Sequence, residues 1–88
     1  MKTVQFLIDN ICADFTVASL LGLARACLAK GPCTLRDIAT AIMRKDPSLD
    51  IKCAEGLAHG ALQALSESGE VEVKESTVYG LSAASRPQ

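Results

Sequence analysis

Apolar residues recur with the 3.6-residue period of an amphipathic α-helix in four successive segments, and the period then changes to two. This periodicity predicts helices over residues 3–14, 16–29, 34–45 and 50–68. The fourth is the most regular, because its apolar residues fall at offsets 0, 3, 4, 7, 8 and 11 from Ala54. Gly31-Pro32 and Asp46-Pro47-Ser48 supply stop signals after the second and third segments. Over residues 70–81 valines alternate with charged residues, which predicts a β-hairpin.

These elements fit one domain of the α+β class that is mainly helical. The chain has 88 residues, of which 49% are hydrophobic and 22% charged, and this composition excludes a disordered chain. We expect the domain to span residues 1–82, followed by a loose tail over residues 83–88. Asp9 and Arg25 interrupt the two apolar stretches that come first, so neither reads as an export signal or a membrane span. The sequence therefore predicts a cytoplasmic protein without membrane contact.

The charge balance limits the partners of this chain. Nine Lys and Arg residues against ten Asp and Glu give a net charge of -1, which excludes a polybasic tail for nucleic acid or membranes. A local basic face remains compatible with this total, because the field depends on where the charges lie. The aromatic residues are Phe6, Phe15 and Tyr79, too few for a platform on which single-stranded bases stack.

The four cysteines, Cys12, Cys27, Cys33 and Cys53, do not have the spacing of a zinc site. No two of them form a Cys-x-x-Cys pair, and His59 is the one histidine of the sequence. We expect reduced and mostly buried thiols, without metal or cofactor. The alternative is redox sensing: the N-terminus of helix 50–68 would lower the pKa of the Cys53 thiol, with Cys33 as its resolving partner.

Three stretches carry a family resemblance: Thr34-Leu35-Arg36-Asp37-Ile38-Ala39, Ala61 to Val71, and Thr77-Val78-Tyr79-Gly80-Leu81. Their order, with the predicted elements around them, resembles the winged helix-turn-helix superfamily. The resemblance covers about residues 16–82. It implies a winged helix-turn-helix fold, in which segment 3–14 is an extra N-terminal helix and the C-terminal two-stranded β-hairpin is the wing.

In that superfamily the third core helix usually lies in the major groove of DNA, and the wing touches backbone or minor groove. The resemblance thus implies a small DNA-binding transcriptional regulator that reads duplex DNA with helix 50–68. Gln pairs with adenine and Lys with guanine in such contacts. The implied DNA-binding residues are Arg36, Arg44, Lys45, Lys52, His59, Gln63 and Lys74. Duplex binding requires the Arg and Lys residues of this set to converge on one face.

Two departures from the family pattern favour an alternative function. Glu70, Glu72 and Glu75 surround Lys74 on the predicted wing, and their charge repels a phosphate backbone. Helix 50–68 also exposes few basic residues. The alternative is a winged-helix protein-protein interaction module, or a small inhibitor, that does not bind DNA.

The predicted N-terminal helix raises the question of a homodimer. Its apolar stripe from Val4 to Phe15 packs either on its own domain or against a second copy, and a dimer doubles the phosphate contacts. Leu21 lies off the main stripe of helix 16–29 and is a candidate for the dimer seam. We expect a homodimer through the N-terminal helix.

Catalysis has little support in the sequence. It shows neither a Ser/His/Asp arrangement nor a Gly-rich phosphate loop, so we expect no enzyme. His59 reads as a solvated residue, and its alternatives are a DNA contact or a metal ligand. Gly56 and Gly60 each cost helix 50–68 about 1 kcal/mol relative to Ala. They permit close approach by DNA, by a partner, or by another helix inside the fold.

Overall fold

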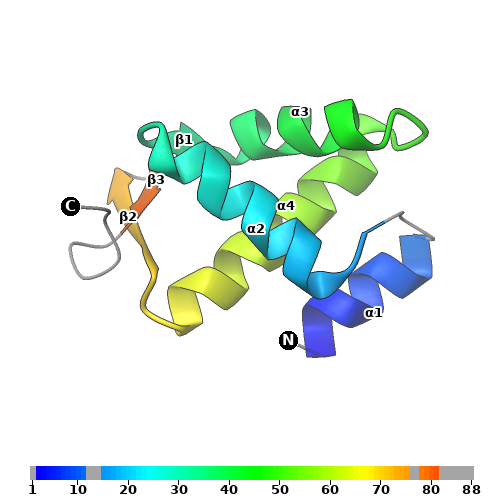
Figure 1. Cartoon of the computed structure of the whole chain (residues 1–88), viewed down its shortest axis with the longest axis horizontal. Coiled ribbons are helices and arrows are strands. Elements are labelled where there is room, and N and C mark those ends of the chain that lie inside the picture. Colours follow the sequence, from blue (N-terminus) through cyan, green and yellow to red (C-terminus); the bar gives the residue numbers. More distant parts are fainter. Residues whose placement is uncertain (1, 12–14, 76–77, 82–88) are drawn as a thin grey trace.

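The computed structural model describes the backbone of residues 2–11, 15–75 and 78–81, and the side chains of residues 4–10, 15–73 and 78–80. In chain order the elements are α1 (Lys2–Ile11), α2 (Val17–Ala29), β1 (Cys33–Thr34), α3 (Leu35–Lys45), α4 (Ile51–Glu67), β2 (Val71–Glu75) and β3 (Val78–Leu81) (Figure 1). The class is α+β and mainly helical, as predicted. The tail over residues 83–88 and the hairpin turn at residues 76–77 lie outside the described residues.

Polar N-cap residues determine where α2 and α3 begin. Thr16 Oγ1 accepts a hydrogen bond from Ser19 N at 3.0 Å, and Ser19 Oγ accepts one from Thr16 N at 2.9 Å. Thr34 and Asp37 exchange the same two bonds at the start of α3. Each pair forms a capping box, which satisfies N–H groups that have no partner within the helix. The chain is not helical at residues 15 and 16, so a break separates α2 from the preceding segment.

The hydrophobic core lies between the helices, with α4 at its centre. α4 packs against α1, α2 and α3, and in Figure 1 α2 crosses in front of it. α3 runs along the opposite side of α2 from α1 in the same view. The buried apolar residues of these four helices include Val4, Ile8, Leu20, Ala24, Leu28, Ile38, Ala39, Ile42, Leu57, Ala58, Ala61 and Leu65.

The apolar face of α1 is covered by α4 of the same chain. Val4 and Ile8 are buried in the common core. A Cβ atom placed on Gly60 would lie 2.6 Å from Leu7 Cδ1 and 3.9 Å from Val4 Cγ2. The glycine therefore allows α1 to approach the α4 backbone closely, as a tight crossing inside the fold. The sequence predicts two arrangements for the N-terminal helix, packing on its own domain or against a second copy. The structure shows α1 packed on its own domain.

The residues available for a dimer seam differ from those expected. Leu21 is buried, with 4% of its surface exposed, so the prediction that it belongs to a seam is wrong. The pattern missed this because α2 is enclosed on two sides, and its buried face is wider than one stripe. Phe6, on the outer side of α1, is 65% exposed. A homodimer through α1 stays a prediction.

The strands form an antiparallel sheet at one end of the molecule, with the order β1-β3-β2 (Figure 1). β2 and β3 are the predicted hairpin, and β1 joins it through the pairs Cys33↔Tyr79 and Thr34↔Val78. The chain leaves α4 through Gly69, whose φ of 83° lies in the left-handed region that favours glycine. None of the helices in the described ranges is both long and apolar enough to cross a membrane.

Candidate nucleic-acid interface

Three of the predicted DNA-binding residues lie together on the outer side of α4. Lys52, His59 and Gln63 are all exposed. Spacings of seven and four residues place them along one helical face, opposite the buried Leu57 and Leu65. The side chain of Asp50 caps this helix by accepting a hydrogen bond from Cys53 N at 2.8 Å. The cap fixes the helix start, so Lys52 lies in the first turn of α4.

Gly56 lies between these side chains, on the same side of α4. A Cβ atom at this position would meet nothing within 4 Å, in contrast to the crowded Gly60. The α4 backbone is therefore accessible at Gly56. Gln63 Nε2 donates a 3.5 Å hydrogen bond to Glu67 Oε1, which orients the amide along the helix.

Arg36 reaches the same face from the first turn of α3. Its Nη2 lies 3.9 Å from Glu55 Oε2, and its side chain is 74% exposed. Such a surface ion pair contributes only about 0–1 kcal/mol to stability. It nevertheless places a cation beside α4 and balances the charge of Glu55. We call Arg36, Lys52, His59 and Gln63 the α4 face.

The turn between α3 and α4 holds the two helices in this relation. Asp46 accepts hydrogen bonds from Ser48 N at 3.2 Å and Ser48 Oγ at 2.5 Å, and it is 9% exposed. Leu49 is buried, and its N–H bonds to Asp46 O at 3.1 Å. A short Asp-centred turn with an apolar anchor thus connects the two helices.

Arg44 and Lys45 do not join the α4 face. Both line a groove between α2 and α3, together with Lys30 and Phe15. Helical geometry explains the position of Lys45, because it follows Arg36 by nine residues and points to roughly the opposite side of α3 at 100° per residue. Arg44 is about 80° away from Arg36 around the helix and lines the same groove as Lys45. The described cations of the predicted DNA-binding set are thus divided between two surfaces, and the expected convergence on one face is not observed among them.

The predicted wing carries less free negative charge than expected. Arg25 of α2 forms a two-pronged ion pair with Glu70, with Nε–Oε1 and Nη2–Oε2 distances of 2.9 and 3.1 Å. This guanidinium lowers the pKa of the Glu70 carboxyl, with help from the Ser68 hydroxyl. The expectation that Glu70 adds to an unbalanced acidic wing is wrong. The side chain of Lys74 lies outside the described residues.

Arg25 is a residue that the sequence did not single out. Its partner is 45 residues away, and no local spacing connects the two. The available signal was only an arginine that interrupts an apolar stripe in helix 16–29. Such an interruption is typical of a solvated residue as well as of a long-range ion pair.

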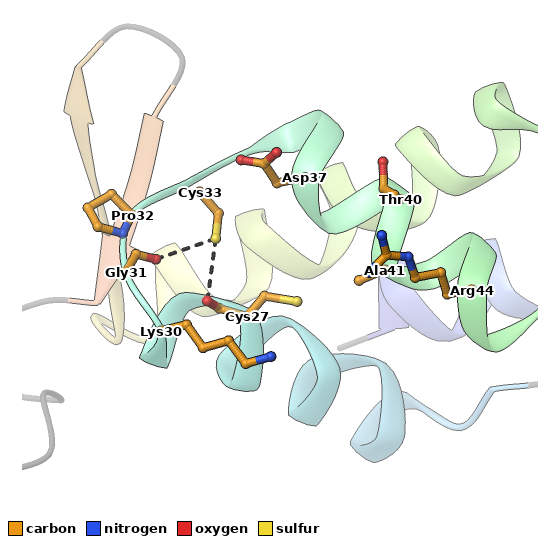
Figure 2. Close-up of a pocket in the computed structure, with 9 residues that line it drawn as sticks. All are labelled: Cys27, Lys30, Gly31, Pro32, Cys33, Asp37, Thr40, Ala41 and Arg44. Atoms are coloured by element: carbon orange, nitrogen blue, oxygen red, sulfur yellow. Dashed lines mark hydrogen bonds between the residues drawn. The ribbon is translucent and has the colours of Figure 1, made fainter.

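The described cysteines, Cys27, Cys33 and Cys53, are free thiols, and the surroundings of Cys33 and Cys53 oppose ionisation. A hydrogen bond to the Asp50 carboxylate raises the pKa of the Cys53 thiol, and burial adds to this effect. Burial also raises the pKa of Cys33, and its Sγ donates to the carbonyls of Cys27 and Gly31 at 3.4 Å (Figure 2). The prediction of a lowered Cys53 pKa is wrong, because the capping carboxylate of Asp50 and burial both raise it. No cluster of three His, Cys, Asp or Glu side chains suited to a metal occurs in the described part.

Comparison of the chain with protein-family models, curated proteins and solved structures finds no match.

Proposed function

We propose that this chain is a small duplex-DNA-binding regulator of the winged helix-turn-helix type, located in the cytoplasm. Because Arg44 and Lys45 do not converge with Arg36 and Lys52, the proposed DNA-binding face has a smaller set of cations than the sequence predicts. The observation that carries the proposal is the α4 face. It presents Lys52, His59 and Gln63 on one exposed side of a helix whose start is fixed by a rigid turn from α3. The one carboxylate between residues 51 and 63 belongs to Glu55, and Arg36 balances it. The free thiols of Cys27, Cys33 and Cys53 suit a reducing compartment.

The topology supports the same proposal. The order α2-β1-α3-α4-β2-β3, with β1 paired to β3, is the arrangement that a winged helix-turn-helix requires. α4 would enter the major groove, and the β2-β3 hairpin would serve as the wing. The extra helix α1 lies on α4 at Gly60, one turn beyond Gly56, and leaves Lys52, His59 and Gln63 exposed.

Three side chains of the α4 face and the backbone at Gly56 have stated roles in this proposal. Gln63 would turn its amide from Glu67 to the edge of an adenine, and Lys52 would reach guanine or phosphate. Arg36 would exchange Glu55 for a phosphate, a stronger charge-assisted partner. The accessible backbone at Gly56 lets the helix approach the base edges closely.

Few cations lie on this surface, so a single copy binds weakly, and its affinity falls only shallowly with salt because few phosphates are contacted. A homodimer through α1 would double the contacts and set the spacing of two half-sites. Phe6, exposed on the outer side of α1, is the residue we propose for the seam. Substituting Phe6 by Ser should shift the protein toward monomer in analytical ultracentrifugation, and an unchanged mass distribution would contradict the seam.

The test of DNA binding is selection of bound duplexes from a random-sequence library at low salt, followed by anisotropy titration of the selected duplex. Lys52→Glu should abolish binding. Lys30→Glu is the matched control, because it makes the same charge change in the α2–α3 groove. Equal losses in the two variants, or no enriched duplex, would contradict the proposal.

The alternative function is a protein-interaction module in which the α4 face contacts a protein. The observation that favours it is the position of Arg44 and Lys45, which face α2 and leave the α4 face with little positive charge. Its test uses cells that express the chain with a photo-crosslinking residue at position 59. A single covalent protein adduct that Lys52→Glu removes, without enriched DNA, would support this alternative over the first.

A further inference from the structure

A second surface feature lies on α2 and α3, away from the α4 face. Two adjoining hollows between these helices share Cys27, Lys30, Ala41 and Arg44, and so form one continuous groove. The hollow that extends to Phe15 has a volume of about 850 Å³, and the one that ends at Cys33 about 400 Å³. We call this feature the α2–α3 groove. Volumes of this order are typical of small-molecule sites.

The walls of the α2–α3 groove are mainly apolar and incompletely covered. Phe15, Leu23, Cys27 and Ala41 are half-buried and line it from both helices. Phe15, Leu23 and Cys27 also pack against the buried core, so their positions are held from below. The groove thus offers a preformed apolar wall that its own chain leaves partly exposed to water.

Three cations border this apolar wall. Lys30 comes from the end of α2, and Arg44 and Lys45 come from the last turn of α3. Figure 2 shows the Lys30 and Arg44 side chains extending toward each other along the groove. The ion pairs found among the described residues belong to other cations, Arg25 and Arg36.

Asp37, at the end of the groove near Cys33, is the acid among its lining residues. Its carboxylate accepts the Thr34 N–H at 2.9 Å and so is directed to the start of α3. Positive charge therefore dominates the section of the groove from Lys30 to Lys45. Cations at the end of α3 also complement its dipole, but that effect does not bring Lys30 of α2 to the same hollow.

We propose that the α2–α3 groove binds a small amphipathic anion. Its carboxylate or phosphate group lies between Lys30 and Arg44, and its apolar body lies along Leu23 and Phe15. An anion there relieves the repulsion between two converging cations and receives charge-assisted hydrogen bonds. The apolar body covers the exposed part of the wall. This site is independent of the proposed DNA contact, because it uses none of the residues of the α4 face.

The experiment is a titration of the ¹⁵N-labelled full chain, followed by amide chemical shifts, with decanoate below its micelle concentration. Decanol and inorganic phosphate are titrated in parallel. Decanoate should produce saturable shifts confined to α2, α3 and the segment between them, and each of the other two probes should bind at least tenfold more weakly. Equal binding of decanol, shifts spread over the whole domain, or no saturable shift would overturn the proposal.

Charge-neutralising variants locate the anion. Arg44→Gln and Lys30→Gln should each weaken decanoate binding about tenfold, which corresponds to ~1.4 kcal/mol for one charge-assisted hydrogen bond. Lys52→Gln is the matched control on the α4 face and should leave the affinity unchanged. An equal loss in the control would show unspecific attraction and overturn the assignment. Because DNA titrations report on Lys52, failure of either proposal is visible without reference to the other.

Discussion

We predict opposite effects on stability for the substitution of Ala at the two interior glycines of α4, Gly56 and Gly60. Gly56→Ala adds a methyl group to open space, since nothing lies within 4 Å of the new Cβ. It should therefore gain the full helix preference of Ala over Gly, about 1 kcal/mol in the free energy of unfolding. In a domain of this size that gain raises Tm by about 4–8 °C.

Gly60→Ala gains the same helix preference but creates a collision. The new Cβ would lie 2.6 Å from Leu7 Cδ1, so Leu7 must leave its position or α1 must move outward. Overpacking of this kind costs roughly 1–3 kcal/mol. We expect a variant that is no more stable than the parent chain, and less stable than Gly56→Ala.

Thermal and urea denaturation followed by far-ultraviolet circular dichroism measure both variants. Leu7→Ala removes the colliding methyl group, so Gly60→Ala should be less harmful in that background than alone. Two results would refute the reasoning. Equal stabilisation by both Ala variants would mean that the Leu7 side chain moves aside at no cost and that Gly60 is not needed for the crossing. Destabilisation by Gly56→Ala would mean that this side of α4 is covered.

Three further predictions concern the Arg25–Glu70 ion pair, the Thr34 cap of α3 and the Cys53 thiol. Because Arg25 lowers the pKa of Glu70, their pair stabilises the fold fully above the ordinary pKa of glutamate, and this stabilisation is lost as the pH falls from there through the lowered pKa of Glu70. In urea titrations, Arg25→Gln should thus reduce the difference between the free energies of unfolding at neutral and at acidic pH. An unchanged difference would contradict a stabilising Arg25–Glu70 pair. Thr34→Ala should lower the free energy of unfolding by about 1 kcal/mol and Thr34→Ser by much less, because only Thr34→Ala removes the cap oxygen of α3. Equal losses of the two variants in urea denaturation would contradict the capping role of Thr34. Asp50→Asn keeps a capping oxygen but replaces the carboxylate whose hydrogen bond and charge raise the Cys53 pKa, so peptide mapping should show faster alkylation of Cys53 by iodoacetamide. An unchanged rate would contradict the cause assigned to the raised pKa.

The helices were predictable because their signals are local. Thr34 with Asp37 three residues later predicted the start of α3, and Asp50 predicted the start of α4. The structure places their first helical residues immediately after these caps, at Leu35 and Ile51. Period and cap agree at each of these starts, and both depend on residues within a few positions of each other.

The features that were missed depend on residues far apart in the chain. β1 has two residues, too few to show alternation, and it exists through its pairing with β3, as in Cys33↔Tyr79. The Arg25–Glu70 pair likewise connects α2 to the start of the hairpin. Neither contact leaves a spacing that one sequence can reveal, because both arise only when the helices have packed.

The sequence predicts which α4 residues share a face of the candidate site, but it does not predict where the α3 cations lie. Residues on α4 share a face because seven and four residues return to the same side of a helix, and the sequence alone contains that information. Whether Arg44 and Lys45 join that face depends on which side of α3 packs against α4, and this is a property of the assembled core. Net charge cannot report it, since a total of -1 is the same for a converged and a divided set of cations.

α3 is common to both proposed surfaces, and this determines how they can influence each other. Its first turn carries Arg36 to α4, and its last turn carries Arg44 and Lys45 to the α2–α3 groove. Binding in the groove changes DNA affinity only to the extent that it shifts α3 relative to α4, and linkage requires DNA to change the affinity for the anion by the same factor. The Asp46–Ser48 turn and the buried Leu49 resist such a shift. The structure therefore favours two sites that act separately, and decanoate titrated into the protein–DNA complex should bind as it does to the free chain.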